Sequence, residues 1–141
     1  MNRLFLFGLA LIPVVGCGGG PDLATVSGKV TYDGKPLENA TVGFYPLGAH
    51  SDILSSGRTN ANGEYSLTVV GSGKSGAVVG DHRVSISVEP EQAGTSDLPA
   101  DKQAKTRPTR IPSKYQGSES QLKCTVPSGG KKDADFELKS K

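Results

Sequence analysis

The chain has 141 residues, with 16 lysines and arginines against 14 aspartates and glutamates, so its formal net charge is +2. This near balance lacks the basic footprint of a nucleic-acid-binding protein, and we expect no nucleic-acid partner. The chain contains only two cysteines, which excludes the multi-bridge framework of small disulfide-stabilised domains.

Residues 1–16 have the pattern of a secretory signal peptide. Arg3 precedes an apolar run over residues 4–15, and this run is too short to cross a hydrocarbon core of roughly 30 Å as a helix. The tetrapeptide Val14-Val15-Gly16-Cys17 resembles the bacterial lipobox. This resemblance implies that Cys17 receives diacylglycerol on its thiol and that cleavage before it removes residues 1–16.

The expected location is the bacterial cell envelope, with Cys17 as the lipid attachment site. Two or three acyl chains hold a protein stably on a membrane, whereas one chain does so only marginally. Gly18 after the cysteine favours the outer membrane or the periplasmic face. An ordinary signal peptide with an incidental cysteine, and an uncleaved anchor, are the alternative interpretations.

Residues 17–23 are rich in glycine and predict a flexible tether, followed by a single domain over residues 24–141. A first strand is expected over residues 25–32, since alternate residues share one face of a strand. Its inward face would carry Val26, Gly28, Val30 and Tyr32. Asp33-Gly34 predicts a tight hairpin turn, and Leu37 is expected to enter the core.

Three further strands are expected before residue 70. Residues 40–46 alternate and end at Pro46, residues 53–59 form a weaker candidate, and residues 64–69 follow a turn at 60–63. The inward residues would be Ala40, Val42, Phe44, Tyr65, Leu67 and Val69. Residues 71–80 contain four glycines and predict a mobile loop.

Residues 81–89 give the clearest strand pattern. Its inward residues would be Val84, Ile86 and Val88, and its outward residues Arg83, Ser85 and Ser87. Residues 90–110 have no periodicity, so we expect a solvated and partly disordered loop there.

The C-terminal part returns to the fold at residues 111–115 and ends in two strands over 122–126 and 134–138, with a turn at 129–132. The inward residues would be Leu122, Cys124, Val126, Ala134, Phe136 and Leu138. Cys124 is therefore expected to be a small buried residue rather than a reactive thiol. Seven short strands with regular turn signals and no helical period predict an all-β sandwich.

Three segments, 26–42, 59–67 and 80–86, resemble successive signatures of carboxypeptidase-regulatory-like, transthyretin-like domains. They read as a G-x-V strand, D-G-K-P-L turn and A-x-V strand, then T-[DN]-x-[DN]-G-x-Y, then G-x-[YH]-x-V. Residues 111–115 and 136–138 are similar to the same regions of planctomycete-type lipoproteins. The resemblance covers nearly the whole mature chain. It implies a seven-stranded antiparallel Greek-key sandwich of the prealbumin type, in a family without a common enzymatic activity.

Hydroxyisourate hydrolases share the transthyretin-like fold, and their closing Tyr-Arg-Gly-Ser is similar to residues 115–118 here. However, Gln116 stands in place of the arginine, and the first strand carries no histidine. Because the functional cations of those enzymes are missing, we do not expect that activity.

No residues predict a catalytic, metal or cofactor site. His50 and His82 are the only histidines. A triad of Ser51, His82 and an aspartate can be written, but no nucleophile-elbow glycines surround the serine. Two histidines do not supply the three or four ligands of a metal centre. Four oxygen-bearing side chains could suggest calcium, but turn formation explains them better: Asp33, Asn60, Asn62 and Glu64.

A basic stretch lies in the expected long loop. Its members are Lys102, Lys105, Arg107 and Arg110. Asp97 and Asp101 screen these charges, so we expect a solvated loop. Contact with acidic polysaccharide or lipid headgroups is the alternative.

The sequence predicts a lipid-anchored, non-enzymatic β-sandwich that acts at the cell envelope as a binding or structural module. Its end loops would recognise carbohydrate or another envelope protein. An assembly role through an exposed edge strand is the first alternative, and an enzyme with an unfamiliar site is the second.

Overall fold

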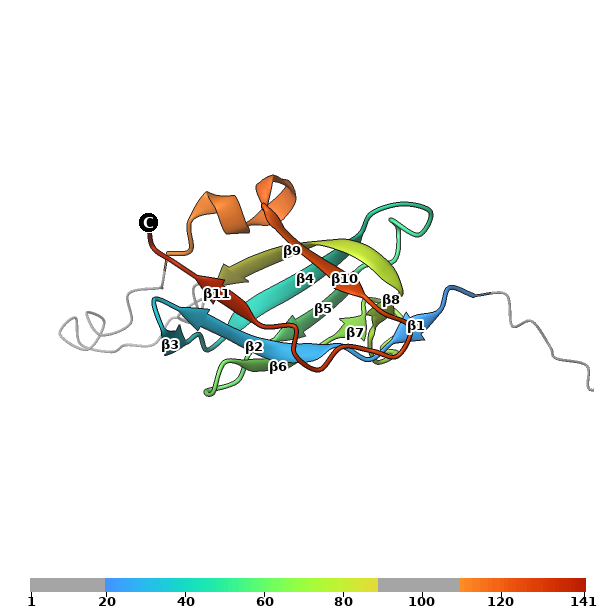
Figure 1. Ribbon diagram of the computed structural model, residues 1–141, viewed down its shortest axis with the longest axis horizontal. Helices are drawn as coiled ribbons and strands as arrows, with labels where there is room; N and C mark the ends of the chain where they lie inside the picture. The colour runs from blue at the N-terminus through green and yellow to red at the C-terminus, as the bar shows by residue number, and fades with distance from the viewer. Residues whose placement is uncertain (1–19, 89–109) are drawn as a thin grey trace, which may run out of the picture.

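The computed structural model describes residues 20–88 and 110–141. Cys17, the signal segment 1–16 and all of the expected long loop except Arg110 lie outside these ranges. The described residues form eleven strands and two single-turn 3-10 helices (Figure 1). The strands are β1 Leu23–Ala24, β2 Ser27–Tyr32, β3 Lys35–Pro36, β4 Ala40–Pro46, β5 Ser55–Arg58, β6 Glu64–Ser66, β7 Thr68–Val69, β8 Ala77–Val78, β9 Gly80–Val88, β10 Leu122–Val126 and β11 Phe136–Leu138. The 3-10 helices are η1 Ser113–Tyr115 and η2 Gly117–Glu119.

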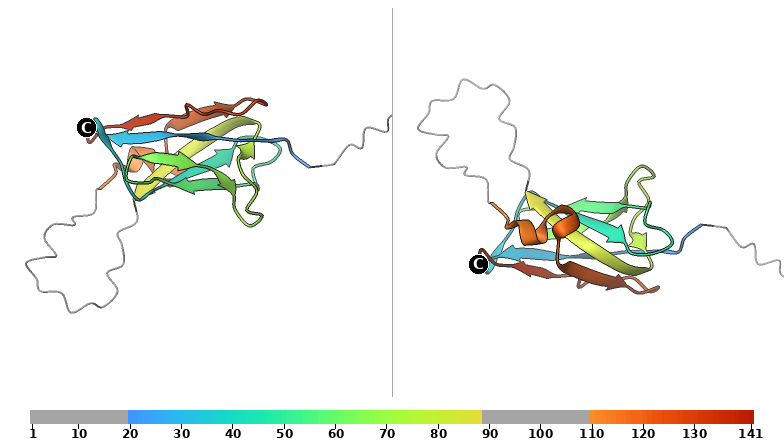
Figure 2. Two further views of the ribbon diagram at one scale, coloured as in Figure 1. Left: turned by 90° about the horizontal axis from the view of Figure 1, so that it is seen from below. Right: turned by 90° about the horizontal axis from the view of Figure 1, so that it is seen from above.

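The strands lie in two layers (Figure 2). One sheet has the order β10-β9-β4-β5-β7, and the other is built on β2, which pairs with β11, β3 and β6. Strands β1 and β8 form a separate pair. The prediction of an all-β fold is confirmed, and no described helix is long and apolar enough to cross a membrane.

Each of the seven expected segments contains a strand, but the pairing differs from the expectation in two places. Residues 64–69 are not one strand, because the chain changes sheets at Leu67. Strand β6 pairs with β2, whereas β7 pairs with β5 in the other sheet. The expected purely antiparallel pairing is also wrong for β11, which runs parallel to β2 with Phe136 opposite Val30. This is possible because residues 127–135 lead the chain from β10 across to the other sheet.

The core lies between the two layers, as the alternation predicted. Val30, Val42, Phe44, Val84 and Ile86 are fully buried. Several residues expected to be inward are only half-buried, though they pack against the core: Tyr32, Val88, Leu122, Cys124 and Phe136. Strand β10 ends its sheet, which leaves one side of Leu122 and Cys124 without a neighbouring strand. The expectation that Cys124 is buried is therefore wrong.

Two segments expected to be loose are partly incorporated into the fold. Leu23, the last residue of the expected tether, pairs with Val78. The glycine-rich segment 71–80 contains β8, and both of its residues, Ala77 and Val78, are buried. Three apolar residues between Gly76 and Gly80 were too short a signal to predict a strand.

Ser85 was expected to face solvent, but it is buried. Its side chain does lie on the outer face of the five-stranded sheet. The 3-10 helices cover it there, and the Gly117 N–H donates a hydrogen bond of 2.7 Å to the Ser85 Oγ. The alternation of β9 was therefore correct, and a distant segment decided the burial.

The turn predicted at Asp33-Gly34 is confirmed. Strands β2 and β3 pair through Tyr32 and Lys35, which leaves Asp33 and Gly34 as the two-residue loop. Both have positive φ, 49° and 82°, as a type I′ hairpin requires. The Asp33 Oδ1 also accepts a hydrogen bond from the Ser140 N–H, which lowers the pKa of this carboxyl.

Candidate functional site

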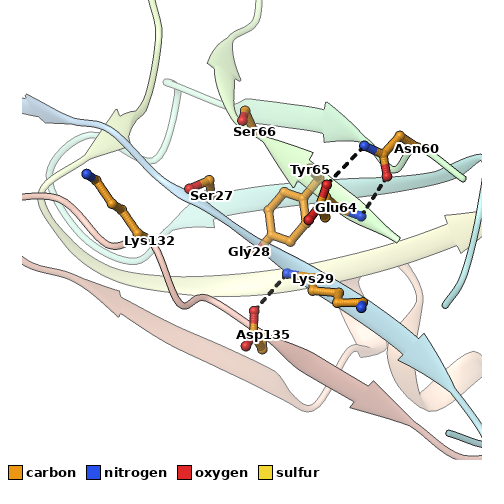
Figure 3. Close-up of a pocket in the computed structure, with 9 residues that line it drawn as sticks. All are labelled: Ser27, Gly28, Lys29, Asn60, Glu64, Tyr65, Ser66, Lys132 and Asp135. Atoms are coloured by element: carbon orange, nitrogen blue, oxygen red, sulfur yellow. Dashed lines mark hydrogen bonds between the residues drawn. The ribbon is translucent and has the colours of Figure 1, made fainter. Parts of the chain in front are cut away.

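An open groove with a volume of about 450 Å³ lies beside β2. We call it the β2–β6 groove. It lies where β2, β6 and the segment before β11 meet (Figure 3). Its nine lining residues are Ser27, Gly28, Lys29, Asn60, Glu64, Tyr65, Ser66, Lys132 and Asp135.

The floor of the groove depends on Gly28. Gly28 lies opposite Tyr65 in the pairing of β2 with β6, and a Cβ on Gly28 would lie 2.1 Å from the Ala134 carbonyl oxygen. The missing side chain therefore lets the Tyr65 ring cross β2, so that its hydroxyl donates a hydrogen bond to the Ala134 carbonyl. Burial raises the pKa of Tyr65, which keeps this hydroxyl protonated and able to donate.

The walls of the groove are polar and carry both signs of charge. Two exposed side chains, Lys29 and Lys132, are positively charged. Two others, Glu64 and Asp135, are negatively charged and also exposed. The Asp135 Oδ1 accepts a hydrogen bond of 2.8 Å from the Lys29 backbone N–H. The segment before β11 is thereby held against the edge of β2.

Asn60 positions the other wall by closing a turn. Its Oδ1 accepts hydrogen bonds from the backbone N–H groups of Asn62 and Glu64, at 2.9 and 3.0 Å. This is the side-chain-to-backbone bonding that the sequence predicted in place of calcium ligation. Asp33 is engaged separately with Ser140, and the described residues contain no group of three or more potential metal ligands.

The groove is suited to binding through hydrogen bonds. Its hydroxyl, amide, ammonium and carboxylate groups offer donors and acceptors, and its one aromatic ring is buried in the floor. The arrangement fits a polar ligand with many hydroxyl groups.

A second, smaller hollow of about 270 Å³ lies at the start of β9 and the end of β10. Its lining residues are Leu47, Asp81, His82, Lys123, Cys124 and Thr125. The Thr125 hydroxyl donates a hydrogen bond of 2.6 Å to the Asp81 Oδ1. Because Asp81 already has this partner, the hollow offers less free polar chemistry than the groove.

The two histidines do not form a site together. His50 and Ser51 are exposed in the loop after β4, whereas His82 is 1% exposed and its ring packs 5.5 Å from Phe44. The His82 Nδ1 donates to the Gly80 carbonyl at 3.0 Å, since a carbonyl can only accept. The Nε2 has no hydrogen-bond partner among the described residues, so the possible triad is not assembled.

The stability of the domain should fall on mild acidification because of His82. Burial lowers the pKa of this imidazole below its ordinary value of 6.5, against weaker opposing effects of Gly80 and Asp81. The unfolded chain then binds a proton that the folded chain does not, so stability is complete above pH 6.5 and declines below it. The slope approaches about 1.4 kcal/mol per pH unit until the folded pKa is reached.

Urea denaturation between pH 7.5 and 5 would measure this loss. His82→Leu keeps the apolar packing but cannot titrate, so its unfolding free energy should fall less steeply with pH. His50→Leu, which changes an exposed histidine, is the matched control and should behave as the wild type. A His82→Leu profile as steep as that of the wild type would rule out this role of His82.

Residues 115–118, which are similar to the hydrolase tetrapeptide, have structural contacts. Tyr115 ends η1, its hydroxyl accepts a hydrogen bond from the Lys139 N–H at 3.4 Å, and Gly117 binds Ser85. The Gln116 side chain donates to the Ile111 carbonyl.

Arg110 is exposed, and the other residues of the predicted basic stretch lie outside the described ranges.

The charged residues of the β2–β6 groove were not predicted as a site, because they come from three separate parts of the chain, around residues 27–29, 60–66 and 132–135. Lys29 and Asp135 are 106 residues apart. A glycine in the middle of a strand pattern was the one available signal, since it often marks a close approach of another group. Comparison with protein-family models, curated proteins and solved structures finds no match to this chain.

Proposed function

We propose that the protein is a lipid-anchored, non-catalytic β-sandwich that binds a polar ligand at the cell envelope through the β2–β6 groove. The observation that carries this proposal is the composition of the groove, with two lysines, two carboxylates, two serines and an asparagine around a volume of about 450 Å³. Carbohydrate is the ligand class that best fits such a surface, because its hydroxyl groups both donate and accept hydrogen bonds.

The location and the finer fold belong to the same proposal. The lipobox-like residues before Cys17 support attachment to the outer membrane or the periplasmic face. The Asp33-Gly34 hairpin and the two-layered arrangement support a transthyretin-like sandwich of the planctomycete lipoprotein type.

The two exposed lysines of the groove provide the test. Lys29→Ala/Lys132→Ala should weaken saccharide binding about thirtyfold, since each of the two charge-assisted hydrogen bonds contributes on the order of 1 kcal/mol. A glycan array with neutral and uronic-acid-containing oligosaccharides would identify the probe, and calorimetry with that saccharide would measure the loss.

Lys35→Ala is the matched control, because Lys35 is exposed in the β2–β3 hairpin outside the groove. Its affinity and the melting temperatures of both variants should stay near those of the wild type. If no saccharide binds, or if the double variant binds as tightly as the wild type, the groove is not a carbohydrate site.

An assembly role through an edge strand is the second candidate. Strand β10 ends its sheet, and the Leu47 N–H donates to the Asp81 carbonyl on the β4 side of β9. Since successive residues direct their backbone groups to opposite sides, the N–H and C=O of His82 point toward β10, where Cys124 is its partner. The backbone groups of Lys123 and Thr125, on either side of Cys124, therefore point away from the sheet. They have no backbone partner among the described residues. A photo-crosslinking residue at Thr125 that captures another envelope protein would favour this role.

A further inference from the structure

The exposed large apolar residues of the described chain have their backbone positions toward one end of the domain. They are Tyr45, Leu47 and Val70, with exposed fractions of 41%, 44% and 55%. Tyr45 and Leu47 lie at the end of β4, and Val70 follows the end of β7. The Val70 N–H donates to the Leu54 carbonyl beside the start of β5, so these chain segments meet at the same end of the five-stranded sheet.

The N-terminal segment leaves the domain at this same end. The Val79 N–H donates a hydrogen bond to the Asp22 carbonyl. Asp81, two residues after Val79, accepts a hydrogen bond from the Leu47 N–H at its carbonyl, so Asp22 and Leu47 both lie beside the start of β9. Figure 1 shows β1, β7 and β8 together at the right, while β3 and the C-terminus lie at the left. The two views in Figure 2 agree with this arrangement.

The tether between the expected lipid and the fold is short. Cys17 precedes Leu23, the first residue of β1, by six positions. A fully extended chain spans at most about 3.5 Å per residue, so this end of the domain cannot lie more than roughly 20 Å from the lipid attachment point. The domain would therefore present its apolar end, rather than the β2–β3 hairpin, to the bilayer.

We propose that this apolar end, formed by Tyr45, Leu47 and Val70, rests on the phospholipid surface that holds the lipid anchor. The proposal depends on acylation of Cys17, which is part of the proposed function. A tyrosine ring and aliphatic tips are the side chains that favour the boundary between headgroups and acyl chains. Three such side chains bury too little area to bind alone, so they orient a domain that the acyl chains already hold.

Apolar contact, rather than charge, drives this docking. The exposed Lys74 lies in the turn after Val70, but the exposed Asp22 and Asp52 lie at the same end. One ammonium against two carboxylates leaves no net positive charge to attract a headgroup phosphate, so the contact with the membrane should persist at high salt. The β2–β3 hairpin and the C-terminus then point away from the membrane.

The chain contains no tryptophan, so single tryptophans report membrane contact without background. Val70→Trp places the reporter at the apolar end, and Lys35→Trp places it at an exposed site in the opposite hairpin. Each lipidated full-length mature protein is reconstituted into phosphatidylcholine vesicles with or without brominated acyl chains, which quench only nearby tryptophan. Lys35→Trp controls for the membrane affinity of tryptophan itself.

Brominated lipid should reduce the Val70→Trp emission about twofold or more, at low and high salt alike, and leave the Lys35→Trp emission unchanged. Equal quenching of both variants, or none in Val70→Trp, would overturn the proposal. An emission blue shift that depends on protein concentration, without quenching, would assign the apolar end to contact with a second copy and would also overturn it.

Failure of the anchor is distinguishable from failure of the docking. Intact mass of the reconstituted protein reports acylation of Cys17, and Cys17→Ala should leave the protein unprocessed or release it from membranes. Unchanged membrane fractionation of Cys17→Ala would overturn the lipid anchor, and the docking proposal with it. A normal acyl mass without selective quenching overturns the docking alone, and saccharide binding by the groove is measured independently of both.

Discussion

Val84→Asp should unfold the domain. Val84 is fully buried in β9, with Phe44 opposite it in β4 and Leu122 opposite it in β10. A carboxylate there would lose its hydration without gaining a partner, and such substitutions cost about 4 kcal/mol or more. Circular dichroism at 25 °C and thermal melting would show the loss of the folded state, or a strongly lowered melting temperature.

Ser87→Asp is the matched control on the same strand. Ser87 is half-exposed on the outer face, so a carboxylate there stays hydrated and the free energy of unfolding should change by about 0.5 kcal/mol or less. Native melting behaviour of Val84→Asp would mean that the inward face of β9 has been assigned wrongly.

Gly28→Ala should destabilise the domain although it adds a single methyl group. The new Cβ would lie 2.1 Å from the Ala134 carbonyl oxygen and 2.4 Å from its carbon. Because both contacts are with backbone atoms, β2 and the segment before β11 must separate, which also disturbs the hydrogen bond from Tyr65 to Ala134. Overpacking of this kind costs about 3 kcal/mol, measured as the free energy of unfolding in urea.

Gly129→Ala provides the comparison. Gly129 lies in the loop after β10, and no atom lies within 4 Å of a Cβ placed there. This substitution should be neutral or slightly stabilising, since alanine restricts the unfolded chain. Equal stability of the two variants would show that the close approach at Gly28 does not constrain the fold.

The sequence correctly predicted the position and the inward face of those strands that have a neighbouring strand on both sides. In β4 and β9, alternation correctly placed Val42, Phe44, Val84 and Ile86 in the core, because side chains of a strand alternate between its two faces. The same rule overestimated the burial of Cys124 in β10. Alternation gives the face of a residue, but its exposure also depends on whether another strand lies beside it.

The candidate groove required information that no local pattern contains. Glu64 and Asn60 were visible in the sequence only as turn residues, and Asp135 only as an outward residue of a short strand. These residues come together because β2 pairs with β6 along one edge, while the Lys29 N–H of β2 binds Asp135 at the other edge. The covering of Ser85 by Gly117, 32 residues away, follows in the same way from contacts between distant segments.

The sequence by itself determined seven segments that contain strands, the tight turn at Asp33-Gly34 and which residue is expected to carry a lipid. These properties depend on side-chain alternation and on the conformations that glycine, asparagine and proline allow within a few residues. Only the tertiary structure decided the switch of sheets at Leu67, the parallel course of β11 and the meeting of Tyr45, Leu47 and Val70 near the N-terminal segment. A strand can bond to any free edge, and packing of the two layers selects the partner.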